Sequence, residues 1–116
     1  MHESVNDYLM NIEGHVKSVN NEIAFPMRLV QKVYNVVFEK KWIILGGDIL
    51  TPVHEYTYDS WYYEPHMQIS LFENVQQSIH KSKQYISTYQ QKHGEQFFVV
   101  FTISGAYVDG RINNPS

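Results

Sequence analysis

Apolar side chains recur at helical spacing in three parts of the chain. In the first, Val5, Leu9 and Ile12 share one side of a helix, and Ser4 and Asp7 have the spacing of a helix-capping pair. We predict a short helix over residues 5–13 with a looser continuation. We predict a break at Asn20-Asn21, because Asn favours turns.

A second stripe begins after Pro26, which suits the first turn of a helix because it has no N–H to leave unpaired. The stripe ends at Glu39-Lys40-Lys41, where cations are favourable at a helix C-terminus. A third stripe follows Ser70 and Glu73, which again have capping-box spacing. It stops near Gly94, a typical residue at a helix end. We predict helices in both segments.

Three other segments have the patterns of β-strands. The run that begins at Trp42 is continuously apolar, which is typical of a strand buried on both faces. Gly46-Gly47 in this run marks a bulge, a tight bend or a close backbone approach. Thr51-Pro52 starts a short turn into an aromatic strand over residues 55–64, and residues 96–104 form a central strand dense in Phe and Val.

Together these elements predict an α+β fold, in which a small sheet of three or more strands packs against two to three helices. The predicted order is α-α-β-β-α-β, in a single domain over residues 1–116. Asp109-Gly110 favours a small hairpin near the end of the chain. The last few residues are expected to be frayed.

The aromatic strand is the most informative segment for function. A period of two places Tyr56, Tyr58, Ser60 and Tyr62 on one face and Thr57, Asp59, Trp61 and Tyr63 on the other. Tyr and Trp dominate protein interfaces, and interleaved carboxylates suit a basic partner. Packing of these rings in the core is the alternative. The candidate contacts are Tyr56, Tyr58, Asp59, Trp61, Tyr62 and Tyr63.

Composition narrows the class of partner. The formal net charge of −3 argues against nucleic acid or an anionic membrane as the main partner. The apolar runs are far shorter than the roughly 20 residues that span a bilayer, and no signal-peptide pattern is visible. Cysteine is absent, so neither a disulfide nor a thiolate site can form. We expect a cytoplasmic protein that needs no cofactor.

The sequence gives only weak indications of a catalytic or metal-binding site. Gly46-Gly47-Asp48 is similar to the diguanylate cyclase signature, but Ile49-Leu50 replaces the Glu-Phe that would follow. We interpret the three residues as a structural turn in which Asp48 bonds local backbone. No histidine pair has the i, i+4 spacing of a helical zinc site, so no metal is expected, although His54, Glu55 and His66 could meet at one end of the hairpin.

Several motifs occur together in the order of a known family. They are Leu45-Gly46-Gly47-Asp48, Tyr56-Thr57-Tyr58-Asp59-Ser60-Trp61-Tyr62, Ser78 with Tyr85-Ile86, and the segment from Asn21 to Phe25. This combination resembles a family of small α+β bacterial immunity proteins from polymorphic toxin systems, with a Gly-Gly-Asp turn after the first strand. The resemblance implies a protein that binds and neutralises a cognate toxin domain and protects the producing cell in contact-dependent competition.

The leading hypothesis is therefore a non-catalytic immunity protein that inhibits its toxin by occlusion. An interaction module or homodimer built on the same strand is the alternative. A small hydrolase or nucleotide-handling enzyme that uses Asp48, His54 and Asp59 is a further one, and it requires those three side chains to converge in a pocket.

Overall fold

A five-stranded antiparallel sheet forms the centre of the molecule, in the order β1-β2-β5-β3-β4. The computed structural model describes residues 4–108 and 111–113 of the 116-residue chain. The strands are β1 (Val16–Lys17), β2 (Ile23–Pro26), β3 (Ile43–Leu50), β4 (Tyr56–Tyr62) and β5 (Phe98–Ser104). As predicted, β3 and β4 form a hairpin, and β5 is the central strand.

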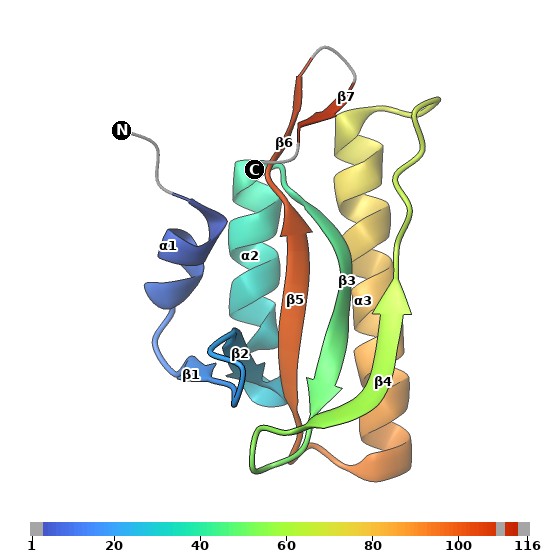
Figure 1. Cartoon of the computed structure of the whole chain (residues 1–116). Helices are drawn as coiled ribbons and strands as arrows, with labels where there is room; N and C mark the ends of the chain where they lie inside the picture. The colour runs from blue at the N-terminus through green and yellow to red at the C-terminus, as the bar shows by residue number, and fades with distance from the viewer. Residues whose placement is uncertain (1–3, 109–110, 114–116) are drawn as a thin grey trace.

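Two long helices cover one face of this sheet, and the opposite face has no such cover (Figure 1). The helices are α1 (Val5–Met10), the short 3-10 helix η1 (Met27–Leu29), α2 (Val30–Lys40) and α3 (Leu71–His93). Helix α1 lies at the β2 side of the sheet, beside α2 (Figure 1), and the Lys40 ammonium of α2 lies 4.4 Å from the centroid of the Tyr8 ring of α1. The predicted α+β class is confirmed, and the face without helices is referred to below as the open face.

The predicted helix caps are present. The Ser4 hydroxyl accepts a hydrogen bond from the Asp7 N–H at 3.1 Å, and Asp7 accepts one from the Ser4 N–H at 2.9 Å. At the start of α3, Ser70 accepts from the Glu73 N–H at 3.1 Å. Gly94 ends α3 with a φ of 96°, a conformation that glycine adopts without a Cβ clash. Local sequence therefore sets where these helices begin and end.

The chain between α1 and α2 differs from the prediction. Helix α1 ends at Met10, and residues expected to continue it form the β1–β2 hairpin, in which Val16 pairs with Ala24. The chain reverses because the Ser18 hydroxyl accepts hydrogen bonds from the N–H groups of Asn20 and Glu22. Pro26 belongs to β2 and precedes η1, so helical backbone begins one residue later than predicted.

The main core lies between the sheet and helices α2 and α3. Its fully buried side chains include Phe25 on β2, Val33 and Val37 on α2, Ile44 on β3 and Val75 on α3. A much smaller apolar cluster lies on the open face. It contains Ala24, Leu50 and Val100, with Val16, Tyr56 and Phe98 packed against them. The two faces of the sheet are thus buried to very different extents.

The end of the chain forms a separate two-stranded hairpin. Strands β6 (Ala106–Val108) and β7 (Arg111–Asn113) pair antiparallel, which confirms the predicted hairpin. Asp109-Gly110 and residues 114–116, where fraying was predicted, lie outside the described residues. Within the described part of the chain, every helix is too short or too polar to cross a membrane.

Candidate partner-binding surface

Strand β4 lies at the edge of the sheet, and one of its faces packs on α3. Trp61 and Tyr63 belong to this face and are only 4% and 7% exposed. The Trp61 ring stacks on Tyr85 of α3 with centroids 5.2 Å apart and meets Phe101 of β5 edge-on at 5.9 Å. These contacts make Trp61 part of the core, so its ring is not available to a partner in this structure.

Tyr63 holds the connection between β4 and α3. Its hydroxyl donates to the Asn74 side-chain oxygen at 2.6 Å. Asn74 also accepts from the His66 N–H and donates to the His66 carbonyl, both at 2.9 Å. Buried polar groups need such partners because a lost hydrogen bond in the interior is costly. Two of the six candidate contacts, Tyr63 and Trp61, are therefore buried and have structural roles.

Asp59 is exposed but is oriented toward α3. Its carboxylate accepts a hydrogen bond from the Tyr89 hydroxyl at 2.9 Å. Burial raises the pKa of the Tyr89 phenol, and the hydrogen bond to Asp59 raises it further. The pKa of Tyr85 is also raised by burial and, secondarily, by the charge of Asp59. Asp59 thus lies on the rim between β4 and α3, where its charge adds to the effect of burial in disfavouring ionisation of both phenols.

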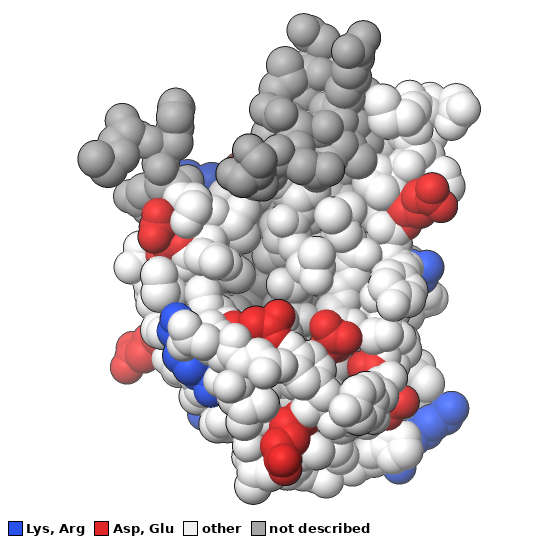
Figure 2. Space-filling model, viewed as in Figure 1, with Lys and Arg blue, Asp and Glu red and all other residues white. Residues whose placement is uncertain are grey.

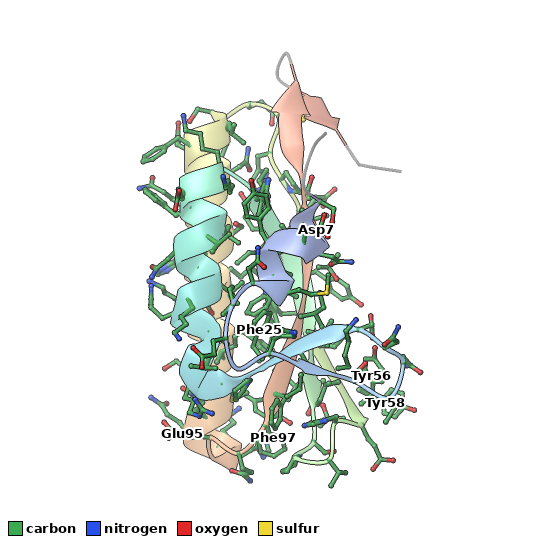
Figure 3. All side chains as sticks on the ribbon, turned by 90° about the vertical axis from the view of Figure 1, so that its left-hand side faces the viewer. Asp7, Phe25, Tyr56, Tyr58, Glu95 and Phe97 are labelled. Atoms are coloured by element: carbon green, nitrogen blue, oxygen red, sulfur yellow. The ribbon has the colours of Figure 1, made fainter. Side chains whose placement is uncertain are left out.

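Tyr58 and Tyr62 are the exposed aromatic residues of β4. Their side chains are 92% and 76% exposed, the largest exposures among the large hydrophobic residues described. Tyr56 is half-buried because it packs against the small apolar cluster of the open face. Figure 3 shows Tyr56 and Tyr58 on the side of the sheet away from α2. A partner approaching the open face would meet Tyr58 and Tyr62 first.

A bulge presents Tyr58 to solvent. Asp48 pairs with Ser60 and Leu50 with Tyr56, so β3 has one residue between these pairs while β4 has three. Tyr58 takes up the excess in a left-handed conformation with a φ of 69°. A bulky side chain adopts this conformation rarely and at a cost of about 1–3 kcal/mol. Backbone strain of this kind is concentrated at binding and catalytic sites.

The glycine pair lies in the middle of β3, which continues through Gly46, Gly47 and Asp48 as a strand. The bulge and the close backbone approach, which the sequence also allowed, are present. A Cβ on Gly46 would lie 2.3 Å from the Trp61 carbonyl oxygen, and one on Gly47 would lie 2.4 Å from the Trp61 ring. Both glycines therefore make room for Trp61, and in the described residues Asp48 accepts no hydrogen bond to hold a bend.

A shallow hollow of about 220 Å³ lies on the sheet above this glycine pair. Asp48 lines it from β3, Ser60 and Tyr62 from β4, and Thr102 from β5. A second hollow of about 230 Å³ lies between α1, the β1–β2 hairpin and β5, and Glu22 and Val100 are among its lining residues. Asp48 pairs with Val100 across the strands, so the two hollows are neighbours.

The charges of the chain are distributed unequally over the two sides of the sheet. Strands β3, β4 and β5 contain Asp48 and Asp59 but not one Lys or Arg. Lys32 and Lys40 on α2 and Lys81, Lys83 and Lys92 on α3 lie on the helical side, while Lys17 on β1 lines the second hollow together with Glu22. Figure 2 shows the open face hollowed near its centre, with Asp and Glu side chains on the lower margin of the hollow.

The enzyme hypothesis finds no converging site. Asp48 lines a hollow of the open face, Asp59 bonds to Tyr89 of α3, and the His54 ring packs against Phe98 at 4.4 Å. His54 and Glu55 precede β4 and His66 follows it, so these residues lie at opposite ends of the strand. Within residues 4–108 and 111–113, no cluster of His, Asp and Glu could hold a metal ion.

Three buried polar residues of α3 were not singled out from the sequence as functional or structural sites. Asn74 holds the β4–α3 connection, and Ser78 accepts from the Ile44 N–H at 3.1 Å beside the bulge in β3. Ser82 shares a hydrogen bond of 2.9 Å with Tyr34, whose pKa is raised to about 12 by burial. These three residues are four positions apart, so they lie on the same face of α3. Polar residues that recur at this spacing indicate buried polar contacts along one helix face.

Comparison with protein families identifies a match. A family model described as Immunity protein 40 matches residues 9–103, which include strands β1 to β4, both long helices and all of β5 except Ser104. No curated protein matches the chain significantly. No solved structure matches it significantly either.

Proposed function

Because the chain belongs to the Immunity protein 40 family, we propose that it binds a cognate bacterial toxin domain and neutralises it by occlusion, without catalysis. The observation that carries this proposal is the family match over residues 9–103. The separation of Asp48, His54 and Asp59 supports a non-catalytic role, because acid–base chemistry needs groups within reach of one substrate. We propose that the protein acts in the cytoplasm of the producing cell. A chain without cysteine is compatible with that reducing compartment, in which disulfides are rare.

We propose that the toxin binds the edge and open face of β4 through Tyr58 and Tyr62. Both rings are exposed, and an aromatic ring that reaches into a partner is a common anchor of tight interfaces. Asp59 would contribute at the rim, where charge affects association rate more than affinity. Tyr56 would contribute the flank of its half-buried ring. Trp61 and Tyr63 would act indirectly, because they fix the strand that carries the contacts.

A second copy of the chain is a weaker fit to the same strand. Edge-to-edge pairing of two sheets needs a regular row of N–H and C=O groups, and the bulge at Tyr58 interrupts that row. Asp59 next to it would also oppose the same charge in a symmetric pair. We therefore expect light scattering of the isolated protein to give a monomer. A stable dimer that is broken by changing Tyr58 and Tyr62 would favour the homodimer.

Co-expression tests the proposed function. The toxin domain encoded beside this chain's gene is expressed in a bacterial host with and without the protein, and growth and co-purification are measured. We expect the protein to restore growth and to co-purify with the toxin. Unrelieved toxicity together with no complex would overturn the proposal for that toxin.

Paired variants locate the surface. Tyr58→Ala combined with Tyr62→Ala should weaken the complex by about 30-fold or more, since anchor residues lose 2 kcal/mol or more on truncation. Phe38→Ala combined with Phe72→Ala is the matched control, because these two exposed rings contact each other on the helical side of the molecule. Loss of binding in the control pair alone would place the toxin on the helices instead.

A further inference from the structure

The hollow above Gly46 and Gly47 combines one carboxylate with a floor of buried glycine backbone. Asp48 is half-buried on the open face, and among the described residues its carboxylate accepts no hydrogen bond. A half-buried carboxylate that accepts no hydrogen bond from its own chain has its acceptor atoms available to a partner. The site is thus suited to a donor supplied from outside the chain.

The walls of the hollow suit an elongated cationic side chain. Gly46 and Gly47 are buried at the floor, and the hollow of about 220 Å³ has room for the methylene groups of a partner's side chain. The hydroxyl groups of Ser60 and Thr102 can accept hydrogen bonds, and the Tyr62 ring at the wall can lie against a cation. A guanidinium group fits these features well, since its planar fork pairs with a carboxylate through two N–H groups.

A second carboxylate on the same face is also short of a donor. Glu22 lines the neighbouring hollow, and its Oε1 atom is buried with no hydrogen-bond partner among the described residues. Val100 separates the two acidic residues, pairing with Asp48 and lining the hollow of Glu22. Lys17 of β1 lines the hollow of Glu22, whereas the described residues around the hollow of Asp48 include no Lys or Arg. The hollow of Asp48 therefore favours a cationic group from a partner.

We propose that the hollow lined by Asp48, Ser60, Tyr62 and Thr102 binds a Lys or Arg side chain of the toxin domain. The inference rests on the proposed function and adds the chemistry of the contact: a cationic side chain enters the open face and pairs with Asp48. The Tyr62 ring, which lines the hollow, lies against the bound cation. The toxin is then recognised through a charge pair with Asp48 in addition to the aromatic contacts of β4.

Two substitutions test this pocket, each with a matched control on the helical side. Asp48→Asn removes the charge, and Glu39→Gln on the exposed side of α2 makes the same change in net charge. Thr102→Arg offers Asp48 a cation from within the chain, and Thr88→Arg places the same side chain on exposed α3. Binding to the purified toxin domain is measured by calorimetry, and urea unfolding of each variant checks the fold.

Asp48→Asn and Thr102→Arg are expected to weaken binding by about 30-fold or more, because they leave the toxin's cation without its buried partner. Both controls should stay within about threefold of the wild type, as expected for rim charges. Should Asp48→Asn fail to fold, Thr102→Arg carries the test, since Thr102 is exposed. If the wild type binds and the test variants match their controls, the pocket is overturned while the proposed function stands. A wild-type protein that does not bind overturns both.

Discussion

The two faces of β4 carry the same kinds of residue with opposite roles. Trp61 and Tyr63 face α3 and are buried, while Tyr58 and Tyr62 face solvent and are the most exposed large hydrophobic side chains described. The rings differ little in chemistry, so the difference comes from α3, which covers one face of the strand and leaves the other open. An aromatic motif therefore identifies an interface only once the covered face is known.

The sharpest way to break this comparison is to truncate one ring from each face. Trp61→Ala should lower the free energy of unfolding by about 3–5 kcal/mol, because it empties a site packed by Tyr85 and Phe101. Tyr62→Ala should change it by less than about 0.5 kcal/mol, since Tyr62 is exposed. Urea denaturation of the two variants measures both values. Equal losses would mean that the two faces are not different in packing.

The glycine pair shows how tightly the face of β4 that α3 covers is packed, and substitution of Gly47 tests this packing. Gly47→Ala would place a Cβ 2.4 Å from the Trp61 ring and 2.8 Å from the Val100 carbonyl oxygen. Overpacking of this kind costs about 1–3 kcal/mol. Thermal or urea unfolding measures the loss.

A double-mutant cycle serves as the control for Gly47→Ala. In a Trp61→Leu background the ring is gone, so Gly47→Ala should cost less than it does in the wild type. If the stability losses of the two substitutions are additive, the Trp61 ring is not the reason that Gly47 must lack a side chain. The Val100 backbone alone is then the reason.

Much of the fold follows from local sequence. The cap residues Ser4 and Ser70 and the stop at Gly94 set helix ends through hydrogen bonds within a few residues, which a sequence displays directly. The β1–β2 hairpin was missed for a physical reason. Val16 continues the helical spacing of α1, but pairing with Ala24 decides its conformation, and that partner is a tertiary contact.

The candidate surface could be predicted only in part. Alternation correctly groups Tyr58 with Tyr62 and Trp61 with Tyr63, because a strand has a period of two. It does not say which group α3 covers, since both groups are amphipathic. It also cannot reveal the bulge at Tyr58, which arises from the pairing register of β3 and β4 and not from the residues alone.

A small gain in stability, expected at Tyr58, is the most telling about function. Tyr58 is 92% exposed and has a φ of 69°, so its side chain contributes little packing while its backbone is strained. Tyr58→Asn should therefore raise the free energy of unfolding by up to about 1 kcal/mol, because Asn tolerates the left-handed region better than Tyr. Urea denaturation measures this gain. Glu55→Asn, an exposed change in the preceding loop, is the control for a general effect of Asn on solubility or the unfolded state.

The same variant should bind the toxin domain less tightly, since it removes one of the two exposed rings. Stability and affinity would then move in opposite directions at a single residue, as expected where a strained conformation is kept for binding and not for folding. If Tyr58→Asn instead destabilises the protein, the ring has a packing role and the two faces of β4 are less distinct than their exposure indicates. If it stabilises the protein and leaves toxin binding unchanged, the strain at Tyr58 has no part in recognition, and Tyr62 with the Asp48 hollow must account for the contact.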